Sequence, residues 1–173
     1  MTVSAASGPI AVSLGDPAGI GPEIVLKAWQ ALRQGGDPFF VVGDRQVLAD
    51  ASSQIPLAVI GSEREAGAVF AQALPIIHMP LASEAVPGRP SSDHGAQVVA
   101  WIRTAVEMAL TGEAMAVVTA PIAKAPLYAA GFKFPGHTEF LGELTAGSPM
   151  NGPRGPIMML AAGDLRTVPV TIH

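Results

Sequence analysis

The amino-acid sequence predicts an α/β protein with three layers and a mostly parallel sheet. Short apolar and β-branched segments alternate along the chain with segments of helical periodicity, an order typical of this fold class. Residues 114–119 are interpreted as a fully apolar strand of the kind buried on both faces of a parallel sheet. Hydrophobic residues make up 49% of the 173 residues, so the chain can bury a substantial core.

Four strands and two helices are expected in the first half. A helix begins at Pro22, because the N–H that proline lacks has no partner at this position, and it ends before Gly35. Asp44 is expected to cap a short helix that runs to about residue 51. The predicted strands are residues 9–14, 39–43, 57–60 and 75–78.

The second half begins with a proline-containing loop, residues 80–90, and a long helix, residues 95–110, with Val98, Ile102 and Val106 on one apolar face. Shorter helices are expected at 121–130 and 138–144. Two strands at 157–161 and 167–172 are expected to pair antiparallel across Gly163 and Asp164.

Composition excludes several classes of protein. The net charge is −4 and the basic residues form no stripe, which gives nucleic-acid binding little support. The chain has no Cys, no signal peptide and no apolar run of roughly 18 residues, so we expect a soluble, cytoplasmic protein that spans no membrane. Charged residues amount to 14%, against about 25% in a typical protein. Either a partner or a large buried sheet would explain this low content equally well.

The first candidate site segment is residues 15–23, GDPAGIGPE, between a predicted strand and a helix. Open α/β sheets place ligand loops at such junctions, and the helix N-terminus favours anions. Asp16, Gly19 and Gly21 are therefore possible site-lining residues. The segment is neither a dinucleotide fingerprint nor a P-loop, and on spacing alone a tight turn explains it better than a phosphate cradle.

Two more segments have the same kind of position. In residues 119–124, TAPIAK, Lys124 could place a cation near a substrate anion, although an exposed lysine in a first helical turn is the commoner case. In residues 135–140, PGHTEF, His137 and Thr138 could donate to carboxylate or phosphate oxygens. On the residues alone, Thr138 as a helix cap and His137 as a structural hydrogen-bonder are slightly favoured.

Single histidines give weaker signals. His173 ends an apolar strand, and neutral imidazole is a common metal ligand, but one histidine does not make a metal site. His78 and His94 are assigned no function.

Taken together, these segments resemble the 4-hydroxythreonine-4-phosphate dehydrogenase family. Residues 15–24 are similar to its N-terminal signature, residues 119–124 to its second block, and residues 134–141 to its substrate-binding block. Residues 158–161 and 170–173 are similar to a strand pair that ends in a metal-binding histidine. The blocks occur in the family's order and cover the whole chain.

The resemblance implies the fold of the isocitrate and isopropylmalate dehydrogenases and a homodimer with active sites at the subunit interface. It implies NAD-dependent oxidation of a small phosphorylated hydroxy acid to a 3-keto acid, which then loses carbon dioxide. His137 and Thr138 would bind substrate. His173 would be one of three histidine ligands of a divalent cation, and the sequence does not distinguish zinc, manganese, cobalt or magnesium.

The chain departs from the family in length, since family members are roughly twice as long. Residues 1–173 correspond to the N-terminal portion, and the second half would carry the other two metal histidines and much of the NAD site. We therefore expect a truncated chain that is inactive alone, because one histidine cannot hold the cation.

Two alternatives remain open on the sequence. The first is a sister dehydrogenase that acts on phosphorylated threonate or erythronate, or on an aromatic cis-dihydrodiol. Ala18 and the His137–Thr138 pair fit a phosphorylated substrate better, but weakly. The second is a non-catalytic binding or dimerisation module.

Overall fold

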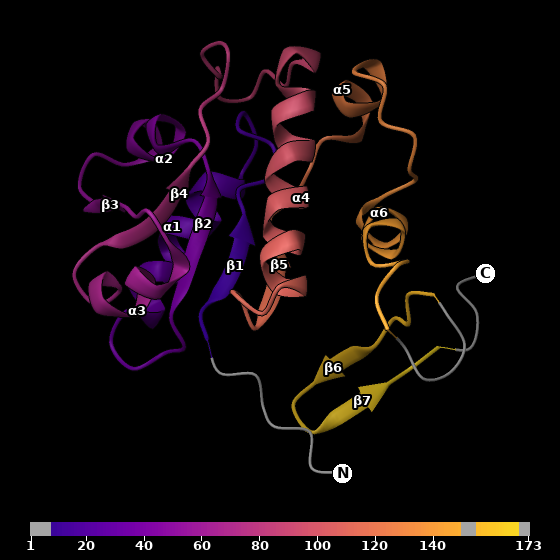
Figure 1. The fold of residues 1–173 in the computed structure, drawn as a ribbon. Coiled ribbons are helices and arrows are strands. Elements are labelled where there is room, and N and C mark those ends of the chain that lie inside the picture. Colours follow the sequence, from indigo (N-terminus) through magenta and orange to yellow (C-terminus); the bar gives the residue numbers. More distant parts are fainter. Residues whose placement is uncertain (1–7, 150–154, 170–173) are drawn as a thin grey trace. The chain divides into compact units, whose positions relative to one another are not determined.

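The computed structural model describes residues 8–149 and 155–169 (Figure 1). The chain divides into two compact units, Met1–Lys133 and Phe134–His173, and each is described by itself. Among the described residues, no helix is both long and apolar enough to cross a membrane.

The first unit is built on a five-stranded sheet in the order β3-β4-β2-β1-β5, in which every neighbouring pair is parallel. Ser13, near the end of β1, is level with Val42 of β2 and Thr119 of β5. The carboxyl ends of these three strands therefore lie at one edge of the sheet. The strands are β1 (Ile10–Ser13), β2 (Phe39–Gly43), β3 (Leu57–Val59), β4 (Leu74–His78) and β5 (Ala116–Thr119).

Helices cover both faces of this sheet, which gives the three predicted layers. Helix α4 (Gly95–Leu110) lies on one face against β1, β2 and β5, and α1 (Gly21–Leu32) lies on the other (Figure 1). The predicted bounds of α4 are confirmed, because its apolar face repeats at helical spacing over four turns. The shorter helices are α2 (Arg45–Ala51), α3 (Ala66–Val69) and α5 (Lys124–Ala129), with 3-10 turns η1 (Glu63–Glu65) and η2 (Ser92–His94).

Two fully buried tryptophans, one in α1 and one in α4, bond these helices to segments that are distant in the sequence. Trp29 of α1 is 1% exposed, and its indole N–H donates to the carbonyl oxygen of Phe70 over 2.8 Å. Trp101 of α4 is 0% exposed and donates to the carbonyl oxygen of Met79 over 3.0 Å. Both indoles thus combine a large apolar burial with a satisfied polar atom.

One prediction about the sheet is wrong. The segment 114–119 was expected to be a strand buried on both faces, but β5 lies at the end of the described sheet and pairs with β1 alone. Val118 is 49% exposed. An apolar composition does not distinguish a central strand from a strand at the margin. Next to it, a groove of about 330 Å³ between α1 and the sheet is lined largely by apolar side chains, including those of Ile24, Leu32 and Val118.

The second unit contains α6 (His137–Leu144) and the antiparallel hairpin of β6 (Leu160–Ala162) and β7 (Leu165–Thr167). The predicted antiparallel pairing is confirmed, but β7 begins earlier than the predicted strand at 167–172. Gly163 has φ +56°, so the two-residue turn is tight and pairing resumes at Leu165. Residues 170–173 are outside the described part of the chain.

Candidate functional site

The ends of β1 and β5 form the point of the sheet best suited to hold a ligand. Strand β1 leads into α1 on one face, whereas β5 leads to α5, which contacts α4 and η2 on the other face. Ligands of open α/β sheets bind outside the carboxyl ends of neighbouring strands whose connections diverge in this way. The segments 15–21 and 119–124, which the sequence singled out separately, both lie here.

Gly15 brings the two segments into direct contact. Its φ is +75°, and a Cβ atom there would overlap the carbonyl oxygens of Ala120 and Pro121. The backbone N–H of Asp16 donates to the Pro121 carbonyl oxygen over 2.9 Å, and the N–H of Ala120 donates to Ser13 over 3.0 Å. Only glycine permits this approach, because it has no side chain and adopts positive φ at little cost.

The rest of the loop is closed around Asp16. One carboxylate oxygen of Asp16 accepts from the N–H of Ala18 over 3.0 Å, and its carbonyl oxygen accepts from the N–H of Gly19 over 3.1 Å. A Cβ atom at Gly21 would lie 2.5 Å from the Leu14 carbonyl oxygen, so this glycine lets α1 start against β1. Asp16 and Gly21 are buried and Gly19 is exposed. The loop is therefore a rigid turn that presents its Gly19 tip to solvent.

Lys124 follows the segment that contacts this loop through Pro121. It is the first residue of α5, and its side chain is exposed. The predicted helix at 121–130 begins three residues later than expected, because Pro121 continues from β5 and its carbonyl oxygen accepts from the N–H of Asp16.

His137 and Thr138 are the first two residues of α6, in the second unit. The alternative in which Thr138 caps this helix is wrong, because the helix begins earlier, with Gly136 at the cap position and no side-chain cap. His137 is half-buried, Thr138 is exposed, and Phe140 packs against Phe134 with ring centroids 5.1 Å apart. The two residues thus occupy the first turn, where backbone N–H groups favour an anion.

The predicted metal ligand His173 is outside the described residues. Within 8–149 and 155–169, no group of three His, Cys, Asp or Glu side chains could hold a metal ion. The described residues alone therefore do not fit a three-histidine cation site.

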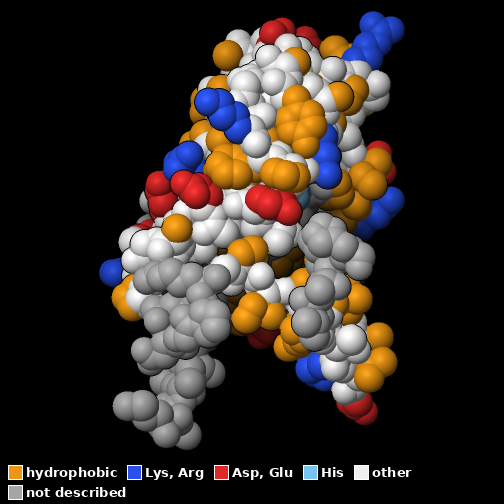
Figure 2. Space-filling view, turned by 90° about the vertical axis from the view of Figure 1, so that its right-hand side faces the viewer, with side chains coloured by type: hydrophobic (Ala, Val, Ile, Leu, Met, Phe, Trp, Pro, Cys, Tyr) orange, Lys and Arg blue, Asp and Glu red, His pale blue; other side chains and the backbone are white. Residues whose placement is uncertain are grey.

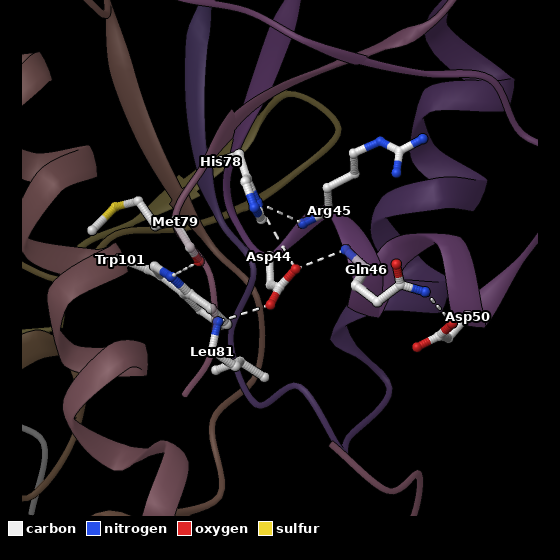
Figure 3. A network of polar contacts seen from close by, with 8 residues as sticks. All are labelled: Asp44, Arg45, Gln46, Asp50, His78, Met79, Leu81 and Trp101. Atoms are coloured by element: carbon white, nitrogen blue, oxygen red, sulfur yellow. Dashed lines mark hydrogen bonds and ion pairs between the residues drawn. The ribbon is translucent and has the colours of Figure 1, made fainter. Parts of the chain in front are cut away.

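A second polar cluster lies where β2 and β4 end (Figure 3). Asp44 accepts from the N–H of Gln46 over 2.7 Å, which confirms the predicted cap, and from the N–H of Leu81 over 2.8 Å. Nδ1 of His78 accepts from the N–H of Arg45 over 3.1 Å, so its 3.8 Å approach to Asp44 is not an ion pair in this arrangement. These contacts fix the loop that leads from β4 toward α4, and their role is structural.

Replacing Asp44 by Ala is expected to lower the free energy of unfolding by about 2–3 kcal/mol. The change removes a helix cap, which contributes about 1 kcal/mol, and leaves the partly buried Leu81 N–H without its acceptor. Asp44→Asn keeps the cap and should lose about half as much. Urea unfolding measures both, with Glu84→Ala, at an exposed position outside this cluster, as a control that should change stability by less than about 0.5 kcal/mol. Equal stability of Asp44→Ala and the control would show that the cluster contributes nothing.

Basic side chains form no patch on the one face of the described surface that Figure 2 shows. On the face in Figure 2, the Lys and Arg side chains that belong to the described residues are scattered among hydrophobic and acidic ones.

His94 is a residue that the sequence did not single out. It is 3% exposed and lines a small cavity with Asp16, at the same edge of the sheet as the two segments. Its position next to the Gly95 start of α4 was visible in the sequence, but its burial depends on the packing of α4 and α5.

Comparison with known proteins agrees with this geometry. The family described as pyridoxal phosphate biosynthetic protein PdxA matches residues 36–173. A 4-hydroxythreonine-4-phosphate dehydrogenase of Caulobacter vibrioides is 57% identical over 96% of this chain and 50% of its own length. The crystal structure of a 4-hydroxythreonine-4-phosphate dehydrogenase from Klebsiella pneumoniae superposes with a TM-score of 0.76 at 33% identity, over 94% of this chain and 50% of that one.

A terephthalate 1,2-cis-dihydrodiol dehydrogenase from Burkholderia xenovorans superposes less well, with a TM-score of 0.67 at 25% identity, over 93% of this chain and 47% of that one. The chain spans about half the length of the relatives it matches. The predicted fold class, that of the isocitrate and isopropylmalate dehydrogenases, is confirmed. The chain belongs to the family of the pyridoxal phosphate biosynthetic protein PdxA.

Proposed function

We propose that this chain is the N-terminal half of an NAD-dependent 4-hydroxythreonine-4-phosphate dehydrogenase. Its substrate would be 4-phosphohydroxy-L-threonine, on the route to pyridoxal phosphate. The observation that carries the proposal is the 57% identity to a relative of that name over nearly the whole chain. Because the chain matches only half of that relative, the complete activity is proposed for this half together with a second half.

In the proposed reaction, the secondary alcohol transfers a hydride to the nicotinamide ring and loses its hydroxyl proton. The resulting 3-keto acid then loses carbon dioxide. His137 and Thr138 would donate to the anionic substrate from the first turn of α6, where the N–H groups add a favourable dipole. His173 would be one ligand of a divalent cation, which when bound polarises the reacting oxygen as a Lewis acid.

The loops at the carboxyl ends of β1 and β5 would form the rigid part of this site. Gly15, Asp16 and Pro121 lock the loop to the end of β5, which leaves Gly19 exposed at its tip. Asp16, Gly19, Gly21 and Lys124 are proposed as lining residues on this ground. We extend the proposal to a cytoplasmic homodimer. A subunit interface would account for the low content of charged residues, 14%, as a large buried sheet also would.

A chimera tests the proposal. Residues 1–173 are joined to the part of the Caulobacter vibrioides relative that follows its matched region, and NADH formation with 4-phosphohydroxy-L-threonine is measured. We expect turnover by the chimera and none by residues 1–173 alone. A folded chimera that binds NAD but is inactive would contradict the proposed reaction, and turnover by the 173-residue chain would contradict the need for a second half.

The proposed substrate contacts can be tested in the same chimera. His137→Asn and Thr138→Val should each raise KM by about 10- to 100-fold, because a hydrogen bond to a charged group contributes about 1.5–3 kcal/mol. The matched control is Glu139→Gln, the next residue of α6, whose side chain is exposed. An unchanged KM in both variants would remove these residues from the substrate site.

The comparisons do not favour the alternatives. The two 4-hydroxythreonine-4-phosphate dehydrogenases named above are 57% and 33% identical to this chain, whereas the cis-dihydrodiol dehydrogenase is 25% identical. A substrate panel containing phosphorylated threonate, phosphorylated erythronate and an aromatic cis-dihydrodiol, applied to the chimera, separates these cases.

A further inference from the structure

A small polar cavity lies behind the loop at residues 15–21. It is enclosed by this loop, the N-terminal end of α4 and the segment that enters α5, and its lining includes Asp16, Ser91, His94, Gly95 and Ala123. Its volume is about 10 Å³. That is the lower limit of the roughly 10–15 Å³ that one water molecule requires, and it is too small for a phosphate or a nucleotide.

His94 gives this cavity an unsatisfied polar atom. The imidazole is 3% exposed, and its Nε2 lies 3.2 Å from the hydroxyl oxygen of Ser83. Ser83 does not line the cavity, and Nδ1 is buried without a hydrogen-bond partner among the described residues. Buried polar atoms are nearly always satisfied by protein or by ordered water, so Nδ1 requires a partner that the cavity can hold.

Asp16 is a second polar residue in the lining of this cavity. Its side chain is buried, with 8% exposed, and its bond from the Ala18 N–H uses one of about four acceptor positions of a carboxylate. A donor placed in the cavity would therefore find a charged acceptor. Hydrogen bonds to a carboxylate are stronger than those between neutral groups.

We propose that this cavity holds one ordered water molecule that links Nδ1 of His94 to the carboxylate of Asp16. The Ser83 hydroxyl donates to Nε2, Nδ1–H donates to the water, and the water donates to Asp16. His94 is thereby a positioning residue that holds the loop at 15–21 against α4. The water site rests on the cavity, on Nδ1 of His94 and on the Asp16 carboxylate, and it does not depend on the proposed function.

A crystal structure of the 173-residue chain at high resolution tests the site directly. An ordered water within hydrogen-bond distance of both His94 Nδ1 and Asp16 is expected, and nitrogen-15 NMR should show His94 with its proton on Nδ1. A cavity without such a water, or a proton on Nε2 instead, overturns the proposal.

Hydrogen exchange tests the positioning role without any activity measurement. His94→Leu should raise the exchange rates of the Ala18 and Gly19 amides by about tenfold and leave those in the C-terminal half of α4 unchanged. His94→Asn, which keeps a polar atom near the position of Nδ1, should restore most of the protection. Asp93→Asn, one residue earlier with an exposed side chain, is the matched control and should have no effect.

A uniform rise in exchange over the whole unit would show a general packing role and overturn the positioning role. Unchanged exchange at Ala18 and Gly19 would do the same. If His94→Leu does not fold, the crystal structure and the NMR tautomer of the unaltered chain still decide whether the water site exists. A chimera that is inactive although the water is present and the loop responds to His94→Leu would count against the proposed function and leave this inference standing.

Discussion

Gly15→Ala is expected to lower the free energy of unfolding of the chain by about 2–5 kcal/mol. An alanine at φ +75° costs about 1–2 kcal/mol, and its methyl group would overlap the backbone oxygens of Ala120 and Pro121, which cannot rotate away as a side chain would. The loop would have to move off β5, and the bond from the Asp16 N–H to Pro121 would break. Urea unfolding gives the loss, and hydrogen exchange at Asp16 shows whether this bond has opened.

Gly112 is the matched control for this change. Its φ is +82°, close to that of Gly15, but no atom lies within 4 Å of a Cβ atom built there. Gly112→Ala should therefore cost only the conformational part, about 1–2 kcal/mol. Equal losses in the two variants would show that backbone conformation alone, and not contact between the two segments, makes glycine necessary at position 15.

Trp101→Ala is expected to destabilise the chain by about 3–5 kcal/mol. The side chain is fully buried between α4 and the sheet, so its removal leaves a large cavity and deprives the Met79 carbonyl oxygen of its donor. Calorimetry or urea unfolding measures the loss. A loss below about 1 kcal/mol would mean that α4 is not seated on the sheet as described.

Two further variants separate the loss of packing from the loss of the hydrogen bond to Met79. Trp101→Phe keeps an aromatic ring but removes the indole N–H, and should cost about 1–3 kcal/mol. Leu110→Ala, in the same helix with a side chain that is 49% exposed, should change stability by less than about 0.5 kcal/mol.

Local chemistry made several parts of this fold predictable from the sequence. Helix α4 was predicted to the residue because its apolar positions repeat at helical spacing. Asp44 was recognised as a cap because its side chain bonds a backbone group two residues away. The class of the sheet followed from the alternation of strands and helices. These features all depend on residues close together in the chain.

Properties that depend on strand order could not be predicted in this way. Each site segment was placed at a strand end, but the contact between Asp16 and Pro121 requires that β5 lie next to β1, which no local pattern specifies. The helical turns at 63–69 were missed because they are short. His94 was left without a function because its burial arises from elements separated in sequence.

Strand β5 has a practical consequence for handling the protein. Within the described sheet it bonds to β1 on one side only, so its other row of N–H and C=O groups has no strand partner in that sheet, next to the apolar groove along α1. A strand of another molecule can pair with such an edge, and unprotected edge strands are a common cause of self-association. The highest concentration at which the purified chain stays monodisperse should thus be governed by β5, and a lysine in place of the exposed Val118 should raise it.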